Sequence, residues 1–177
     1  SIDYSYDFVA DDGKLTAGKP AQAIEDRIAQ VTQEAYDNGD YIFVAMDRHD
    51  EGDTFHPETK LFPPHNIAGT SGRELYGKLA SVYDAIKDDN RVFWMDKRHY
   101  SAFSGTDLDI RLRERRVTTV VLTGVLTDIC VLHTAIDAYN LGYDIEVVAS
   151  ATASLKPEAH DFAIGHFKNV LGATIVE

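Results

Sequence analysis

The only cysteine of the chain, Cys130, lies in a pattern that suits nucleophilic chemistry. The β-branched and aliphatic run at residues 117–122 predicts a buried strand, and Thr123-Gly124 predicts a turn. A helix is predicted to begin soon afterwards, with Cys130 in its first turn. Free N–H groups and the helix dipole favour an anion at such a start, so we expect a lowered thiol pKa and a reactive thiolate. The alternative is a buried cysteine that only packs the helix.

Two other residues can supply what a thiol nucleophile needs. Asp3 lies near the end of the first predicted strand, and Lys97 follows a short predicted strand at residues 92–94. A carboxylate within hydrogen-bond reach can take the thiol proton, and an ammonium group stabilises the thiolate. Backbone N–H groups of the turn can form an oxyanion hole. The set suits acyl transfer through a thioester, although an acid at a turn and an exposed lysine are both ordinary.

A second group of residues has the types and spacing of a metal site. Asp47 and His49 directly follow a buried apolar run, and His65 can join them from the next loop, together with either Glu58 or His56. Mixed nitrogen and oxygen ligands suit zinc, and also iron or manganese. The alternative is a polar surface loop that holds no metal.

The same loop has the length of a calcium-binding EF-hand loop, from Asp47 to Glu58 with Gly52 in the sixth place. However, His49 stands where an acid or amide is usual, and Pro57 precedes the last ligand position. A strand also precedes the loop, where the EF-hand requires a helix. We therefore expect no calcium loop here.

Strands and helices alternate along the chain. Strands are predicted at residues 2–6, 41–45, 92–94, 117–122, 145–148 and 173–176, and helices at about 20–38, 72–86, 108–112, 130–142 and 157–172. This order predicts a single-domain α/β three-layer sandwich, with a mostly parallel sheet of about six strands and helices on both faces. Residues 46–73 form a long polar loop, which in a compact domain is usually functional.

In such a sheet, ligands bind beyond the carboxyl ends of the strands. Asp3, Asp47, Lys97 and Cys130 each lie at or just after a predicted strand end, so we expect them to meet at one edge. Several aromatic residues flank these positions and can form the walls of a pocket for a flat ring: Phe8, Phe62, Trp94, Tyr100 and Phe103. Core packing is the alternative for all of them, and is our expectation for Trp94. The last two helices are predicted to place these residues in the core: Ile129, Leu132, Ile136, Tyr139, Phe162, Ala163, Phe167 and Val170.

The composition excludes several classes of protein. With 177 residues, 44% hydrophobic and 26% charged, the chain predicts one globular domain over residues 1–177. A net charge of −12 argues against binding to nucleic acid or to an anionic membrane surface, and no apolar run reaches the roughly 18 residues of a membrane span. One cysteine allows no internal disulfide, and there is no signal peptide, so we expect a cytoplasmic protein. The chain begins at Ser1 within a predicted strand, and we expect further residues of that strand before it.

Five motifs occur in an order typical of one enzyme family. They are Ile2-Asp3-Tyr4-x-x-Asp7-Phe8, Asp47-Arg48-His49, Phe62-Pro63-Pro64-His65 followed by Gly69-Thr70, Asp96-Lys97-Arg98, and Gly124-Val125-Leu126-Thr127-Asp128-Ile129-Cys130-Val131. Over nearly its whole length, the chain resembles the nicotinamidase/pyrazinamidase branch of the isochorismatase-like cysteine hydrolases.

The resemblance implies a catalytic role for Asp3, Lys97 and Cys130. Cys130 would attack the carboxamide carbon of nicotinamide, Asp3 would pass the thiol proton to the leaving ammonia, and Lys97 would stabilise the charged pair. It also implies a cis peptide bond between Val125 and Leu126, and an oxyanion hole formed by the N–H groups of Leu126 and Cys130.

The resemblance also implies one divalent metal ion, zinc in the first place with iron or manganese open, that binds the pyridine nitrogen of the substrate. Asp47, His49 and His65 match the metal ligands of the family. Many members have a third histidine where this chain has Thr54-Phe55, so Glu58 is our choice for the remaining ligand, with His56 second. Four residues would surround the ring: Phe8, Phe62, Tyr100 and Leu126.

The function implied is hydrolysis of nicotinamide to nicotinate and ammonia for NAD salvage, with pyrazinamide as a further substrate. Three alternatives stay open: an amidase for another carbamoyl compound, an isochorismatase-type vinyl-ether hydrolase, and a non-catalytic metal-binding interaction protein on the same fold. The metal residues and Cys130 argue against the second, and the intact set of Asp3, Lys97 and Cys130 argues against the third. The oligomeric state stays open between a monomer and a homo-oligomer.

Overall fold

Every pair of named strands in the computed structural model, which describes residues 1–177, is parallel. β1 pairs with β2, and β4 lies between β3 and β5. No helix has the length and apolar character to cross a membrane. The elements are α1 (Tyr6–Val9), α2 (Lys19–Ala23), α3 (Glu25–Asp37), β1 (Ile42–Asp47), η1 (Pro57–Lys60), η2 (Ser71–Arg73), α4 (Gly77–Ile86), β2 (Val92–Lys97), α5 (Leu108–Glu114), β3 (Thr119–Val125), η3 (Thr127–Val131), α6 (Leu132–Asn140), β4 (Asp144–Ala153), α7 (Pro157–Asn169) and β5 (Thr174–Val176).

The first residues of the chain join the two groups of strands. Ile2 forms a parallel bridge with Ala45 of β1 and another with Gly124 of β3. Its N–H donates to the carbonyl of Thr123, and its carbonyl accepts the N–H of Val125, both at 2.9 Å. The order is therefore β2-β1-Ile2-β3-β4-β5, which agrees with the predicted parallel sheet of about six strands.

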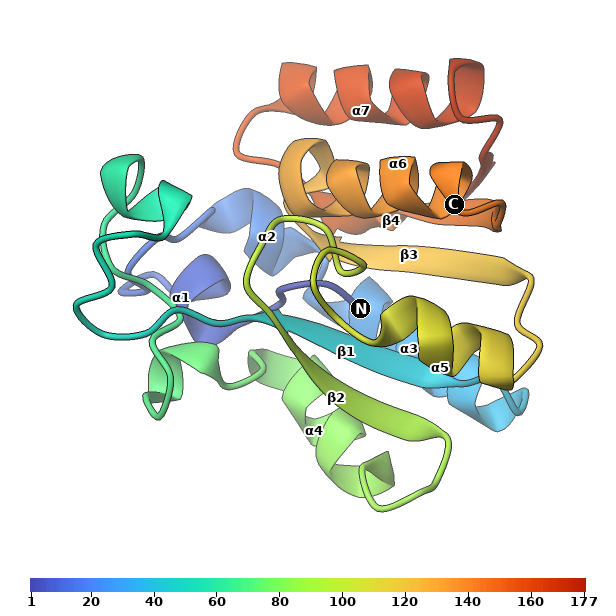
Figure 1. Ribbon diagram of the computed structural model, residues 1–177, viewed down its shortest axis with the longest axis horizontal. Coiled ribbons are helices and arrows are strands. Elements are labelled where there is room, and N and C mark those ends of the chain that lie inside the picture. The colour runs from blue at the N-terminus through green and yellow to red at the C-terminus, as the bar shows by residue number, and fades with distance from the viewer.

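Helices cover both faces of this sheet (Figure 1). One face packs against α5, α6 and α7 in a core that includes Ala135, Val147 and Phe167. The other face packs against the helices α1 to α4 in a core that includes Ile28 and Leu79. Because successive strand residues point to opposite faces, each of the strands β1 to β4 supplies both cores. The predicted three-layer α/β architecture is correct.

The first predicted strand, residues 2–6, is shorter than expected. The chain leaves the sheet after Asp3, and α1 begins at Tyr6. Ser5 caps this helix, since its side-chain oxygen accepts the N–H of Phe8 at 3.4 Å. The cap is a local signal that outweighs the β propensity of the neighbouring tyrosines.

The helix predicted at residues 72–86 begins only at Gly77. Leu75 forms an antiparallel bridge with Ser5, and the N–H of Tyr76 donates to the carbonyl of Tyr4 at 3.0 Å. This pairing keeps the chain extended just before α4. It joins segments about 70 residues apart, so no local pattern predicts it.

The helix after the Cys130 turn follows the prediction in part: Ile129, Leu132 and Ile136 pack against the core, but Tyr139 does not. In η3 the N–H of Val131 donates to the carbonyl of Leu126, five residues back, at 3.2 Å. This π turn has one residue more than an α turn and shifts the phase of the helix that follows. Ala135 and Ala138 are therefore buried, and Tyr139 is 53% exposed.

Three more aromatic and aliphatic residues lie outside the core where we expected packing. Phe162 and Val170 are exposed on α7, next to the buried stripe of Ala163 and Phe167. Trp94 is 37% exposed, and its indole N–H donates to Asp96 at 3.0 Å. The indole N–H of Trp94 thus has a hydrogen-bond acceptor at the surface.

A glycine is required at position 124 because the backbone of Ile2 lies very close to it. Its φ is +113°, and a Cβ there would lie 1.9 Å from the carbonyl oxygen of Ile2. We expect Gly124→Ala to lower the free energy of unfolding by at least about 2 kcal/mol, measured by urea denaturation. Gly142→Ala is the matched control, because Gly142 also has positive φ (+83°) but no atom within 4 Å of its Cβ position. Equal losses in both variants would mean that backbone strain alone is responsible.

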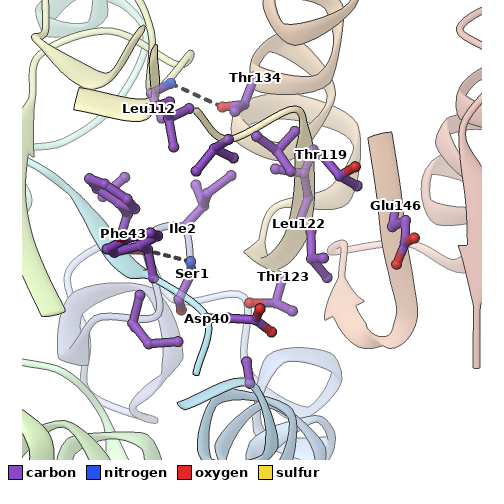
Figure 2. A pocket seen from close by; sticks show the side chains of 18 of the residues that line it. Ser1, Ile2, Asp40, Phe43, Leu112, Thr119, Leu122, Thr123, Thr134 and Glu146 are labelled. Carbon is purple, nitrogen blue, oxygen red and sulfur yellow. Dashed lines mark hydrogen bonds between the residues drawn. The ribbon is translucent and has the colours of Figure 1, made fainter. Parts of the chain in front are cut away.

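A cavity of about 500 Å³ lies between β1 and β3, beside the amino end of the sheet segment at Ser1. Figure 2 shows Ser1, Ile2, Phe43 and Leu122 around it. None of the predicted catalytic or metal-ligating residues lines this cavity, although Phe103, one of the aromatic candidates for a pocket wall, does. The candidate chemistry therefore lies elsewhere, at the carboxyl ends of the strands.

Candidate active site

Asp3, Lys97 and Cys130 lie together at the carboxyl edge of the sheet. The Lys97 Nζ is 2.7 Å from Oδ2 of Asp3, 3.4 Å from Oδ1 of Asp47 and 3.7 Å from Sγ of Cys130. It also donates to the carbonyl of His99 at 3.1 Å. All four interacting side chains are buried, and that of Lys97 is fully so. An ammonium group thus lies within reach of a thiol and two carboxylates, all of them largely removed from solvent.

The sheet sets these distances. The register of β1 and β2 places Asp47 opposite Lys97, the last residue of β2. Strand β2 is three residues longer than predicted, so Lys97 lies on a strand and not in a loop. The N–H of Asp3 donates to the carbonyl of Ala45 at 3.0 Å, and Oδ1 of Asp3 accepts the N–H of Asp47 at 2.7 Å. Backbone pairing within the sheet therefore holds Asp3, Asp47 and Lys97 in place.

The Cys130 thiol differs from our expectation. Burial raises its pKa well above the usual value, although the nearby charge of Lys97 acts in the opposite direction. The predicted lowering by a helix start is wrong, because Cys130 lies in a buried π turn between strand and helix, where loss of hydration disfavours the thiolate. The resting thiol is protonated and needs a base to react.

Asp3 has the properties of such a base. Burial raises its pKa to about 6, with Lys97 lowering it and the negative charge of Asp47 raising it. The carboxyl group of Asp3 and the thiol of Cys130 are close enough for each to shift the pKa of the other. A base whose pKa is near neutrality can accept and return a proton at physiological pH.

Lys97 stays charged despite its burial. Loss of hydration lowers its pKa, but the negative charges around it, that of Asp3 first, raise it above the usual value. Burial also tends to raise the pKa of Asp47, but the charge of Lys97 and the nearby imidazoles of His49 and His65 hold it below the usual range. The edge of the sheet therefore carries fixed charges of both signs.

A second cluster adjoins this group and can hold a metal ion. One donor atom each from Asp47, His49, Glu58 and His65 lies within 4.8 Å of the others, and all four residues are buried. Nε2 of His49 is 2.7 Å from Oδ2 of Asp47, and Nε2 of His65 is 3.5 Å from the same oxygen. Nε2 of His65 is also 3.8 Å from Oε2 of Glu58. Two carboxylates and two imidazoles converge on one point.

The imidazole of His65 fits the role of a metal ligand. Its Nδ1–H donates to the carbonyl of Pro63 at 2.8 Å. This bond sets the tautomer and leaves a lone pair on Nε2, which is the arrangement that ligating histidines use. Nε2 is buried and has no hydrogen-bond partner. A bound cation would satisfy this atom, so the donor set fits the metal that the resemblance implies.

His56, our second choice for the remaining ligand, is engaged elsewhere. Its Nε2 donates to the carbonyl of Arg98 at 2.5 Å, and its Nδ1 accepts the N–H of Glu58 at 3.3 Å. Both ring nitrogens are therefore occupied. His56 acts as the cap of η1 and thereby holds Glu58, whose carboxylate faces the histidines.

This difference leads to a direct prediction. We expect Glu58→Ala to weaken zinc binding by about 10-fold or more, because it removes a donor. His56→Ala should weaken it less, because His56 only supports the loop. Both affinities are measured by competition with a chromophoric chelator. A larger loss of zinc affinity for His56→Ala than for Glu58→Ala would make His56 the ligand and Glu58 the supporting residue.

Two arginines that we did not single out from the sequence, Arg73 and Arg98, contact the loop that follows β1. Arg98 pairs with Asp53 at 2.8 Å and also with Asp50. Arg73 donates to the carbonyl of Asp47 at 2.9 Å. Because Asp50 and Asp53 face Arg98, and Asp47 and Glu58 converge with two histidines, the segment does not have the ligand arrangement of a calcium loop. Arginines far apart in sequence carry no local signal of this role.

Thr134 is a further residue that the sequence did not reveal. Its hydroxyl donates to the carbonyl of Cys130 at 2.7 Å and accepts the N–H of Ala102 at 3.0 Å. It therefore ties the cysteine turn to the loop that carries Tyr100. Its place four residues after Cys130 on a helix is the only signal that the sequence offers.

Two of the predicted ring-contact residues lie against His65. The ring centroid of Phe8 is 5.3 Å from that of His65, and the centroid of Phe62 is 6.2 Å away. Tyr100 packs against the core cluster that includes Cys130. Burial raises its pKa, and the negative charge of Glu58 adds to the shift. Phe103, in contrast, stacks on Tyr143 in the core.

The peptide bond between Val125 and Leu126 is cis, as the resemblance implied. The N–H of Leu126 has no acceptor within the protein, which leaves it available to another group. The predicted oxyanion hole needs such a donor beside the nucleophile.

The fold and the site together define a class: a parallel α/β protein with a buried Asp, Lys and Cys group next to a cluster that can hold a metal. The Isochorismatase domain model matches residues 1–176, and the chain belongs to the isochorismatase family. The isochorismatase family protein PncA of Bacillus subtilis (strain 168) is 54% identical over 176 residues, which are 99% of this chain and 96% of the relative.

Solved structures agree with this assignment. A pyrazinamidase/nicotinamidase from Streptococcus mutans UA159 is 81% identical, with a TM-score of 0.98 over 99% of this chain and 97% of that one. The nicotinamidase/pyrazinamidase PncA from Bacillus subtilis is 54% identical, with a TM-score of 0.98 over 99% and 96%. A pyrazinamidase of Pyrococcus horikoshii in complex with zinc is 27% identical, with a TM-score of 0.85 over 99% and 96%.

Proposed function

We propose that this protein is a nicotinamide amidohydrolase that converts nicotinamide and water to nicotinate and ammonia in NAD salvage. The observation that carries the proposal is the contact of Lys97 with Asp3 and Cys130, directly beside the cluster of Asp47, His49, Glu58 and His65. The names of the similar structures support the substrate class. Pyrazinamide, with a similar ring and the same carboxamide, is expected to be a further substrate.

The proposed reaction begins with the Cys130 thiol, whose proton passes to Asp3. The sulfur attacks the carboxamide carbon, and the oxygen takes up negative charge towards the N–H groups of Leu126 and Cys130. Asp3 returns the proton to the nitrogen, and ammonia leaves from a thioester. Water, deprotonated by Asp3, then attacks the thioester, releases nicotinate and restores the thiol. Lys97 keeps its charge throughout and stabilises the anionic states.

We propose Asp47, His49, Glu58 and His65 as ligands of one divalent ion, with zinc favoured by the mixed donors. A bound ion would supply a coordination site for the ring nitrogen and would orient the ring. Phe8 and Phe62 would contact the ring, and Tyr100 and Leu126 would complete the pocket. The near-complete burial of the site would exclude water from the charged intermediates.

The test is ammonia release from nicotinamide by the purified, zinc-loaded protein, with benzamide as the matched substrate that lacks the ring nitrogen. We expect nicotinamide to be hydrolysed faster than benzamide, and removal of the metal by a chelator to abolish most of this preference. No release from nicotinamide, but release from another carbamoyl compound, would identify a different amidase. No release from any amide would favour a binding protein on this fold.

A further inference from the structure

A buried polar network links α1 to the loop that carries His65. The carboxylate of Asp7 accepts the N–H of Asn66 at 2.8 Å and that of Lys14 at 3.2 Å. The hydroxyl of Ser5 donates to the side-chain oxygen of Asn66 at 2.9 Å. Asp7, Ser5 and Asn66 are all buried, and no cation lies within ion-pair distance of Asp7. A buried charge without an ion partner depends entirely on such N–H donors.

Asn66 is the junction between the network and the metal-capable cluster. It directly follows His65, and its carbonyl accepts the N–H of His49 at 3.1 Å. Its φ is +45°, in the left-handed region that asparagine tolerates better than most residues. The backbone at Asn66 is therefore bonded to His49 on one side and to Asp7 on the other.

The position of the Asp7 carboxylate is closely restricted. It packs against the Cα of Gly72, where a Cβ would lie 2.2 Å from Oδ2 of Asp7. A side chain at position 72 would therefore displace the carboxylate. In its observed position, with Gly72 on one side, the carboxylate faces the N–H of the residue after His65.

We propose that Asp7 is a positioning residue for the metal cluster: its carboxylate fixes the backbone of Asn66 and, through it, the imidazole of His65 opposite Asp47. The proposal rests on the proposed function in one respect, since it takes the cluster to hold a metal. Groups that orient a ligand from outside the coordination sphere typically change metal affinity by about 10- to 100-fold. Asp7 acts through a backbone N–H and touches no reacting atom.

The experiment measures zinc affinity without substrate, by competition with a chromophoric chelator. We expect Asp7→Ala to bind zinc about 10- to 100-fold more weakly than the parent protein. Asp7→Asn keeps one oxygen that can accept the N–H of Asn66, so its affinity should lie between the two. The matched control is Asp109→Ala, which removes a carboxylate that accepts from Tyr143 and Arg113 far from the cluster. It should lower thermal stability and leave zinc affinity unchanged.

The outcomes separate positioning from general stability. A zinc affinity of Asp7→Ala within twofold of the control, at a temperature where both are folded, would overturn the proposal. If Asp7→Ala does not fold, Asp7→Asn decides by the same criterion. A parent that binds no zinc would also overturn it. A parent that binds zinc and hydrolyses no nicotinamide would overturn the proposed function alone, and the affinities of the Asp7 variants would still decide this proposal.

Discussion

Replacement of Cys130 by alanine is expected to reduce ammonia release from nicotinamide by about 10⁴-fold or more, because the chain has no other thiol to form a thioester. The proposed metal ligands do not include Cys130, so zinc content should stay at the parent level. Cys130 is a small buried residue within the core, and alanine fits the same space. The measurement is the initial rate at saturating nicotinamide, with zinc content from elemental analysis of the same samples.

A chemical control uses the single cysteine of the parent. A thiol reagent such as iodoacetamide should abolish turnover, and nicotinamide should protect against it, because the substrate would cover the sulfur. Reaction should be slow at neutral pH, since burial raises the thiol pKa well above its usual value. Equal turnover by the parent and Cys130→Ala would mean that the metal and not the thiol carries the chemistry, and the proposed mechanism would be wrong.

Replacement of Lys97 by methionine is expected to have the largest combined effect on activity and stability. The variant loses the one cation beside two buried carboxylates, those of Asp3 and Asp47. Breaking such a buried pair typically lowers the free energy of unfolding by about 3 to 5 kcal/mol. Turnover should fall to background, because neither the thiolate nor the developing oxyanion would have a nearby positive charge.

The stability defect of Lys97→Met should depend on pH. The pKa of Asp3, already raised by burial to about 6, should rise further without the opposing charge of Lys97. A carboxyl group whose pKa is higher in the folded than in the unfolded state destabilises the fold when it is ionised. The defect relative to the parent should therefore be full above the raised folded pKa of the variant and shrink as the pH falls to about 6, below which Asp3 is protonated in both folded proteins. Urea denaturation of metal-free parent and variant at both ends of this range tests it.

Lys78→Met is the matched control, since Lys78 forms an exposed ion pair with Asp26. Its loss should change stability little, because water and salt screen such a pair. A small and pH-independent change in both lysine variants would contradict the role assigned to Lys97. A large loss of stability with full turnover would separate the structural role of Lys97 from catalysis.

Local patterns in the sequence predicted much of this protein. Continuous apolar runs such as residues 41–45 predicted buried strands, and their alternation with amphipathic helices predicted the three-layer fold. The position of Asp3, Asp47, Lys97 and Cys130 at strand ends predicted that they would meet at one edge. These inferences succeed because side-chain periodicity and the parallel order of strands depend on the chain itself.

The tertiary structure decided the features that depend on contacts between distant segments. The π turn at η3 centred the buried face of α6 on Ala135 and Ala138, with Leu132 and Ile136 beside them and Tyr139 exposed. The carbonyl of Arg98 accepts a hydrogen bond from Nε2 of His56, so this nitrogen is not free to bind a metal. Glu58 instead faces the histidines. No local pattern specifies such a partner.

The Cys130 thiol shows most clearly which properties follow from the sequence and which follow from the tertiary structure. The sequence by itself determined that Cys130 follows a strand and a glycine turn, and that an acid and a lysine end neighbouring strands. Only the folded chain determined how deeply the sulfur is buried and which charges surround it. Desolvation and charge proximity set the pKa, and both come from packing. The sequence therefore determined which groups meet, and the tertiary structure decided the state in which they meet.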